Sequence, residues 1–408
     1  MDCLFIHGNY PGQFKHLAPL LSNNGHRVVF LTNRSDALNH TQKGVEVRIY
    51  KPHRQPSRDT HHYLQSTEEC ILRGQAIIRE LNNLLEEGFN PRFVISHGGM
   101  GLGLFVKNIL PKTVHIGYFE WYFKACTTKH LVSDFSLDTQ LKSDLRNLTI
   151  LQEIENCDIA VVPTLWQKQQ FPKPYQEKLN VIFDGIDRKF FHPQTNILSP
   201  NNQALKIKDR ETKEVFVVPE GAKIISYATR GMETLRGFPE FMRSLPEILE
   251  KDDETYAVIA GADRCAYSYE APSHKGSWKQ FMLEELIEKL PLNRVFFTGL
   301  LDYTDYRTLL WRSNLHCYFT RPYVTSWSLF EAAACGARLA VNTSPATKGI
   351  VKESSITWVD LDDQFKLTQQ LCEAVAKEGK RSELREGFDL ETTLKHWEKL
   401  LNHAIQSN

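Results

Sequence analysis

The stretch Arg321-Pro-Tyr-Val-Thr-Ser-Trp-Ser-Leu-Phe-Glu-Ala-Ala-Ala-Cys-Gly336 lies between two short apolar segments, residues 315–319 and 339–342. This order predicts a strand, a tight loop, a short helix that stops at glycine, and a second strand. The stretch therefore indicates an α/β fold with a loop and a helix start placed where a ligand can bind.

Two interpretations of this helix start remain open. In the first, the unpaired N–H groups at Ser326 or Ser328 and the helix dipole attract a diphosphate, while Glu331 binds ribose hydroxyls. In the second, Ser328-Leu-Phe-Glu331 is a capping box, in which serine and glutamate each bond the other's backbone. The stretch by itself favours the capping box, and the rest of the sequence favours the nucleotide-sugar site.

The composition is that of a globular protein without a bulk charge. The 408 residues indicate two or three domains, and the 49 basic residues balance the 49 acidic ones. This balance gives no general attraction to nucleic acid or lipid. The eight cysteines contain no CxxC pair, which is typical of free thiols in a reducing compartment. With no signal peptide pattern and no membrane-spanning run, we expect a cytoplasmic protein.

The alternation of strand and helix patterns runs through both halves of the chain. In the N-terminal half, a strand at 2–6, helical spacing over 14–23 and a buried strand at 27–32 open a doubly wound fold. In the C-terminal half, a strand at 224–228 and a helix at 238–249 begin the same unit again. The chain therefore predicts two similar α/β domains with a cleft at the carboxyl ends of their strands.

A polar segment separates the two halves. Residues 194–223 contain few large apolar groups and form the best linker candidate. The predicted parts are an N-terminal domain at 1–190, a linker at 191–222, a C-terminal domain at 223–383 and a final helical region at 384–408.

Three places at strand ends carry candidate chemistry. Gly12, in the first loop, would let the backbone approach a ligand closely, although a plain turn is equally consistent. His97 ends a strand and is suited to bonding a sugar hydroxyl or stabilising charge, with a structural role as the alternative. Arg230 and Arg236 flank a loop after the second domain's first strand, and two guanidinium groups suit a leaving diphosphate.

Motifs for a metal or a resident cofactor are missing from the sequence. Gly99-Met-Gly-Leu-Gly103 does not have the G-x-G-x-x-G spacing, and it does not follow the first strand. The Asp-x-Asp within 360–363 is expected on a solvated turn. We therefore expect no metal site and no cofactor other than a nucleotide-sugar co-substrate.

Several motifs together resemble a known family. They are His7-Gly-Asn-Tyr-Pro-Gly-Gln-Phe14, Pro163-Thr-Leu-Trp-Gln167, Asp184-Gly-Ile-Asp187, Arg230-Gly-Met-Glu233 with Arg236-Gly-Phe238, and Ser326-Trp-Ser-Leu-Phe-Glu-Ala332. This set resembles family 4 glycosyltransferases of the GT-B fold, in particular a bacterial subgroup whose N-terminal loop reads His-x-Asn-Phe/Tyr-Pro-Gly-Gln-Phe.

The resemblance implies two Rossmann-like domains that face a central cleft, and a C-terminal helix that crosses back to the N-terminal domain. It implies a retaining, metal-independent transfer from a UDP- or GDP-linked sugar to a saccharide, lipid-linked or protein acceptor. A lipid-linked acceptor would bring the protein to the inner membrane surface. The residues implied as catalytic are His97, Arg230 and Arg236; those at the donor are Gly12, Tyr323, Thr325, Ser326, Trp327, Ser328 and Glu331; those on the acceptor side are Asn9, Tyr10, Glu120 and Trp166.

Two departures from the family pattern bear on specificity. Tyr323 stands eight positions before Glu331, where the family has a glutamate that contacts the transferred sugar. The identity of the sugar therefore does not carry over from the family. Arg236 follows Arg230 by six positions instead of the usual five, which indicates a longer loop. A nucleotide-sugar epimerase of the same fold and a non-catalytic binding subunit remain alternatives.

Overall fold

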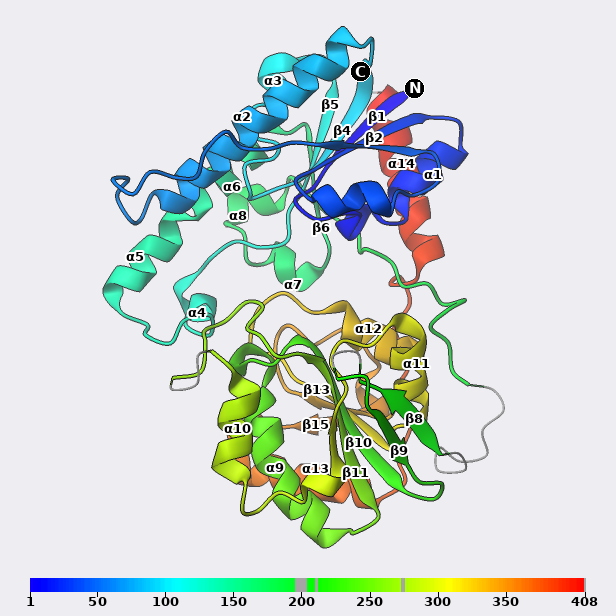
Figure 1. Cartoon of the computed structure of the whole chain (residues 1–408). Coiled ribbons are helices and arrows are strands. Elements are labelled where there is room, and N and C mark those ends of the chain that lie inside the picture. The colour runs from blue at the N-terminus through cyan, green and yellow to red at the C-terminus, as the bar shows by residue number, and fades with distance from the viewer. Residues whose placement is uncertain (195–203, 210–211, 273–275, 407–408) are drawn as a thin grey trace. The chain divides into compact units, whose positions relative to one another are not determined.

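The computed structural model describes residues 1–194, 204–209, 212–272 and 276–406, which divide into two compact units (Figure 1). Unit 1 consists of Met1–Thr128, Asp134–Gly185 and Glu391–Asn408, and unit 2 consists of Lys129–Ser133 and Ile186–Leu390. Each unit contains a parallel sheet with helices around it, as the alternating patterns predict.

The sheet of unit 1 has the strand order β3-β2-β1-β4-β5-β6-β7, and all of its pairs are parallel. Its strands are β1 (Asp2–Ile6), β2 (Arg27–Thr32), β3 (Val45–Ile49), β4 (Pro91–His97), β5 (Val114–Tyr118), β6 (Ile159–Val162) and β7 (Leu179–Val181). Most of these strands read as continuous apolar runs because helices cover both faces of a parallel sheet. The chain order reverses beside β1, and such a switch point is where ligands bind in open α/β sheets.

Helices surround the sheet of unit 1, and two of them, given below, show how its core forms. The helices are α1 (Leu17–Asn23), α2 (Gln65–Glu86), α3 (Val106–Ile109), α4 (Ala125–Thr128), α5 (Leu137–Leu145), α6 (Asn147–Asn156), α7 (Leu165–Lys168), α8 (Lys173–Gln176) and α14 (Leu390–Gln406). Helix α2 buries Ile77 and Leu81 in the cluster that contains Leu4 of β1. Trp397 and Leu401 of α14 join the other cluster, around Phe5 and its neighbours. The predicted return of the C-terminal helix to the N-terminal domain is confirmed.

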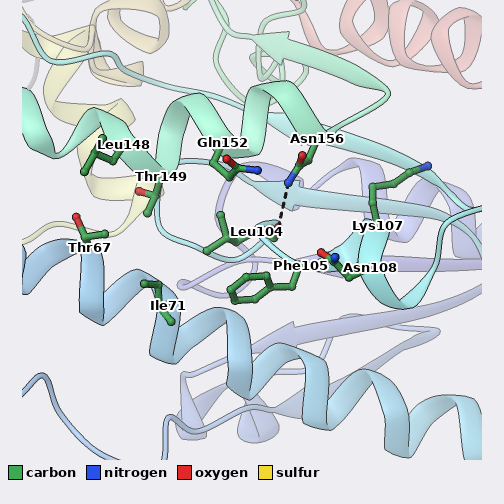
Figure 2. A pocket seen from close by; sticks show the side chains of 10 residues that line it. All are labelled: Thr67, Ile71, Leu104, Phe105, Lys107, Asn108, Leu148, Thr149, Gln152 and Asn156. Atoms are coloured by element: carbon green, nitrogen blue, oxygen red, sulfur yellow. Dashed lines mark hydrogen bonds between the residues drawn. The ribbon is translucent and has the colours of Figure 1, made fainter.

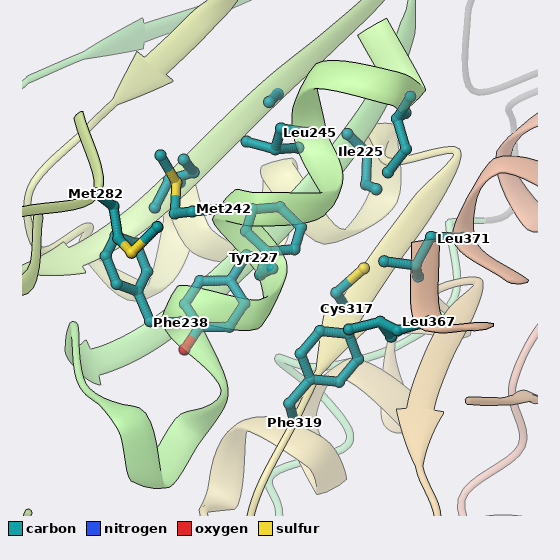
Figure 3. Close-up of a cluster of buried hydrophobic side chains, with 14 of the residues drawn as sticks. Ile225, Tyr227, Phe238, Met242, Leu245, Met282, Cys317, Phe319, Leu367 and Leu371 are labelled. Atoms are coloured by element: carbon teal, nitrogen blue, oxygen red, sulfur yellow. The ribbon is translucent and has the colours of Figure 1, made fainter. Parts of the chain in front are cut away.

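The sheet of unit 2 has the order β12-β11-β10-β13-β14-β15 and is also parallel. Its strands are β10 (Lys223–Gly231), β11 (Thr255–Ala262), β12 (Val295–Phe297), β13 (Leu315–Tyr318), β14 (Leu339–Asn342) and β15 (Thr357–Val359); its helices are α9 (Phe238–Lys251), α10 (Trp278–Leu286), α11 (Tyr303–Arg312), α12 (Trp327–Ala334) and α13 (Gln364–Ala376). Figure 3 shows part of its core, where Tyr227, Phe238 and Phe319 lie among aliphatic side chains. Here β10 occupies the switch point, between β11 and β13.

Part of the predicted linker has regular structure. Strands β8 (Leu205–Lys208) and β9 (Val215–Val218) form an antiparallel hairpin, and Leu205 and Ile207 pack against Ile224 of unit 2. Lysines alternate with Leu205 and Ile207, which is the pattern of a strand. The polar composition of the whole segment made this short pattern hard to recognise. Residues 195–203 and 210–211 of the predicted linker lie outside the described residues.

Candidate functional site

Helix α12 begins directly after Ser326 in unit 2. The Ser326 side-chain oxygen accepts hydrogen bonds from the backbone N–H of Ser328 (3.3 Å) and from its hydroxyl (3.0 Å). Ser326 is therefore the N-cap, and the interpretation of Ser328 and Glu331 as a capping box is wrong, because Ser328 already lies inside the helix. The hydroxyl of Thr325 donates to the carbonyl of Ala346 (2.5 Å), which anchors the loop before the helix.

Arg236 joins two loops at the carboxyl edge of the sheet in unit 2. Its guanidinium is buried and donates to Thr320 Oγ1 (2.7 Å) and to the carbonyl of Val324 (3.1 Å). Both acceptors lie on the segment between β13 and α12. A guanidinium carries several N–H donors, so these two bonds orient Arg236 without using all of its capacity for an anion.

Tyr267, which the sequence did not single out, contacts three of the predicted residues. Its hydroxyl accepts a hydrogen bond from the exposed Arg230 (3.5 Å), and its ring centroid lies 5.7 Å from the Arg236 guanidinium carbon. The ring centroid of Tyr323 lies 5.8 Å from the ring centroid of Tyr267. Tyr267 follows β11 at the sheet edge where Arg230 lies near the end of β10, so its place after a parallel strand is the signal that would have found it.

A buried glutamate holds the loop that carries Tyr267. The Oε2 atom of Glu233 accepts hydrogen bonds of 2.9 Å from each backbone N–H of residues 266–268. The side chain of Glu233 is fully buried, and its carboxylate accepts the hydrogen bonds that these three loop N–H groups would otherwise donate to water. The motif Arg230-Gly-Met-Glu233 therefore includes a residue that positions Tyr267.

Arg230 and Glu331 act electrostatically on the same group, the hydroxyl of Tyr303 at the start of α11. Tyr303 is 51% exposed, and its partial burial raises its pKa; the negative charge of Glu331 adds to this rise and the positive charge of Arg230 opposes it. Glu331 itself is buried in α12. Arg230 and Glu331 therefore act in opposite directions on the pKa of one tyrosine of unit 2.

In unit 1, four side chains form a hydrogen-bonded series at the switch point. His97 Nε2 lies 3.0 Å from Glu120 Oε2, and Glu120 Oε1 accepts from the side-chain amide of Gln13 at 2.8 Å. The Gln13 oxygen lies 2.6 Å from His7 Nε2, and His7 Nδ1 accepts from the backbone N–H of Asn9 at 2.7 Å. The loop after β1 and the ends of β4 and β5 are thus joined through side chains.

The two histidines of this series are buried and adjacent. Their ring centroids are 4.4 Å apart, and burial, followed by the neighbouring His97, lowers the pKa of His7 well below its usual value. His97 Nδ1 is buried and has no hydrogen-bond partner within the described part of the chain. A buried polar atom without a partner is uncommon and indicates a place for a ligand.

The remaining predicted residues of unit 1 lie around this series. Gly12 has a φ of +52°, and a side-chain Cβ there would lie 2.7 Å from the His7 ring, so only glycine fits. The hydroxyl of Tyr10 accepts a hydrogen bond from the backbone N–H of Gln42 (2.8 Å), so it is engaged within the fold. Trp166 is half-buried, 6.1 Å from the ring of Trp121.

The glycine-rich loop after β4 binds a carboxylate of the protein itself. Glu153 of α6 accepts hydrogen bonds from the backbone N–H groups of Gly99 (3.2 Å) and Gly101 (2.7 Å). Burial raises the pKa of Glu153 to about 7, although the loop amides act in the opposite direction. These N–H groups therefore hold Glu153 and do not form a phosphate-binding loop.

The comparisons with known proteins bear on the family and the fold. A sequence model of the glycosyl transferase family 4 group matches residues 24–191. These residues are therefore similar to the family 4 group, and the match covers the larger part of unit 1. No curated protein sequence matches the chain at a significant level.

Several solved structures share the fold of this chain at low sequence identity. Sucrose-phosphate synthase from Thermosynechococcus elongatus is 13% identical with a TM-score of 0.67, over 100% of both chains. WaaG, a glycosyltransferase involved in lipopolysaccharide biosynthesis, is 15% identical with a TM-score of 0.57, over 100% of this chain and 96% of that one. A TarM mutant from S. aureus, in complex with fondaparinux, α-GlcNAc-glycerol and UDP, is 13% identical with a TM-score of 0.52, over 81% and 59%. The fold is GT-B.

Unit 1 also has a pocket apart from the predicted residues. A cavity of about 550 Å³ opens in unit 1 between α2, α3 and α6 (Figure 2). Its one charged lining residue, Lys107, donates to both carboxylate oxygens of Asp158. Among the described residues, no group of His, Cys, Asp and Glu has the arrangement of a metal site, and no helix has the length and hydropathy to cross a membrane.

Proposed function

We propose that this glycosyltransferase transfers a sugar from a UDP- or GDP-linked donor to an acceptor hydroxyl and retains the anomeric configuration. The observation that carries the proposal is the convergence of Arg230 and Arg236 on Tyr267, with Arg236 bonded to the loop before α12, the helix that contains Glu331. Two guanidinium groups and a helix N-terminus suit a diphosphate, and a buried carboxylate suits ribose hydroxyls.

The proposed reaction needs charge stabilisation more than it needs a protein nucleophile. The acceptor oxygen forms a bond to the anomeric carbon on the face from which the diphosphate leaves. The bond from that carbon to the phosphate oxygen breaks, and the acceptor proton moves to the leaving diphosphate. Arg230, Arg236 and the N–H groups after Ser326 stabilise the negative charge that grows on the leaving group. They supply the positive charge without a metal ion.

The aromatic group around Tyr323 supports a role in sugar specificity. Tyr323 replaces the family's glutamate and lies beside Tyr267, so this part of the site presents two aromatic rings. Aromatic rings pack against the C–H faces of sugars and carry hydroxyls for their edges. The UDP bound in the TarM complex and the lipopolysaccharide pathway of WaaG support a nucleotide donor and a saccharide acceptor, with membrane contact where the acceptor is lipid-linked.

Thermal-shift measurements with UDP- and GDP-sugars test the donor first. A donor at about 100 times its Kd stabilises the native state by about 2.7 kcal/mol. Product analysis with and without an acceptor then separates transfer from epimerisation. Arg230→Ala and Glu331→Ala should each abolish both the shift and the transfer. Arg243→Ala is the matched control, because Arg243 pairs with Glu285 on the surface of the same unit. Full transfer by both site variants would refute the proposal.

A further inference from the structure

Proton positions in the series from His7 to His97 follow from the donors and acceptors alone. A backbone N–H can only donate, so His7 Nδ1, which faces the N–H of Asn9 at 2.7 Å, is an acceptor. The neutral imidazole of His7 then carries its proton on Nε2. This proton is donated to the side-chain oxygen of Gln13, 2.6 Å away.

The other end of Gln13 requires the same orientation. A carboxylate can only accept, so the group of Gln13 that faces Glu120 Oε1 at 2.8 Å must be its NH₂. The second oxygen of Glu120 accepts from His97 Nε2 at 3.0 Å. The proton of a neutral His97 therefore lies on Nε2, and the buried Nδ1 presents a lone pair.

A second motif holds the backbone of Glu120. The side-chain NH₂ of Gln167 donates to the carbonyl of Glu120 (2.9 Å), and the hydroxyl of Thr164 donates to the side-chain oxygen of Gln167 (2.8 Å). Thr164 is also the N-cap of α7. The loop at His7 and the segment at Thr164 therefore both converge on Glu120, which was expected on the acceptor side.

We propose that His7, Gln13 and Glu120 are positioning residues that hold His97 in the Nε2–H tautomer, so that Nδ1 accepts a hydrogen bond from a hydroxyl of the sugar substrate. The nature of this ligand rests on the proposed transferase function, whereas the tautomer does not. The direction of every bond in the series, rather than the charge of Glu120, selects the tautomer.

Exchanging the two middle side chains tests this directly. In Glu120→Gln, the new amide at position 120 still accepts from Gln13 and must donate to His97 Nε2. His97 then carries its proton on Nδ1, and this nitrogen can no longer accept. In the double variant Gln13→Glu with Glu120→Gln, the new carboxylate accepts from His7 and from the new amide, whose oxygen again accepts from His97 Nε2–H. The bonds donated by His7 and by His97 thereby keep their wild-type directions, the bond between positions 13 and 120 is reversed, and the charge at position 120 stays absent.

Imidazole ¹⁵N NMR of the unliganded full-length chain reads the tautomer of His97, and melting temperatures show that each variant is folded. We expect Nε2–H in the wild type, Nδ1–H in Glu120→Gln, and Nε2–H again in the double variant. With the best of UDP-glucose, UDP-N-acetylglucosamine and GDP-mannose, we expect kcat/KM to fall about tenfold in Glu120→Gln, as for one lost hydrogen bond. The double variant should recover to within about threefold of wild type.

Three outcomes decide the matter. An Nδ1–H tautomer in the wild type, or in the double variant, would overturn the positioning series whatever the activity. A restored tautomer without restored kcat/KM would show that the charge of Glu120 matters and the tautomer does not, which also overturns the proposal. If none of the three donors reacts in the wild type while the tautomers follow expectation, the transferase function fails and the positioning series stands.

Discussion

The guanidinium of Arg236 donates a 2.7 Å hydrogen bond to Thr320 Oγ1, and this bond joins the turn after β10 to the loop that leads into α12. A lysine can supply a positive charge there but lacks the planar fork whose two nitrogens bond Thr320 and Val324 separately. We expect Arg236→Lys to lower kcat about 100-fold, the effect of losing a preorganised charge at a leaving group. Steady-state transfer kinetics measure this, with Arg243→Lys as the control. An unchanged kcat would mean that Arg236 serves the fold alone.

Removing the hydroxyl of Tyr267 should weaken donor binding a little, and removing its ring as well should weaken it more. Tyr267→Phe removes only the hydroxyl that accepts a 3.5 Å bond from Arg230, so we expect at most about a threefold rise in the Kd for the donor. Tyr267→Ala also removes the ring beside Arg236 and Tyr323, and a rise of about tenfold corresponds to one cation–π contact. Isothermal titration with UDP or GDP gives both values. Equal effects of the two substitutions would refute the role of the ring.

The buried carboxyl of Glu153 should make unit 1 less stable as pH rises. Its folded pKa of about 7 lies above the ordinary value of 4.5, so its contribution is complete below pH 4.5 and is lost as pH rises through 7. The loss is on the order of 3 kcal/mol, from about 1.36 kcal/mol per pKa unit. Glu153→Gln should remove this dependence. Denaturant midpoints between pH 4.5 and 8 test it, and parallel curves for both proteins would contradict it.

The C-terminal helix should be necessary for the stability of unit 1. Trp397 of α14 is buried in the cluster that contains Phe5. We therefore expect Trp397→Ala to lower the free energy of unfolding by about 3–5 kcal/mol. His396→Ala, at the exposed neighbouring position, should change stability by less than about 0.5 kcal/mol. Chemical denaturation followed by hydrogen exchange in unit 1 distinguishes the two. Equal stability of both variants would mean that α14 contributes little to this core.

Local patterns were enough to predict the fold class. The alternation of buried strands with helical spacing predicted two similar α/β domains, whereas the return of the last helix to the N-terminal core was implied by the family resemblance. These signals are local because the spacing at which side chains recur on one face depends only on whether the element is a helix or a strand. The hairpin from 205 to 218 was overlooked because short strands at the surface contain few apolar residues.

The candidate site could be predicted only as separate positions. His97, Arg230, Arg236 and Glu331 stood near strand ends or a helix start that the sequence pattern had indicated, and Glu120 was implied by the family resemblance. Which of them touch could not be read from the chain, because that depends on which strands pair and on the path of each loop.

The sequence by itself determined the kinds of elements, their order and the places where loops carry polar side chains. Only the tertiary structure decided that Gln13 lies against Glu120 and that Tyr267 lies between Arg230 and Arg236. The physical reason is that parallel pairing brings the carboxyl ends of β1, β4 and β5, and of β10 and β11, to one edge of each sheet. Residues as far apart as Gln13 and Glu120 are joined there by hydrogen bonds whose directions no local pattern specifies.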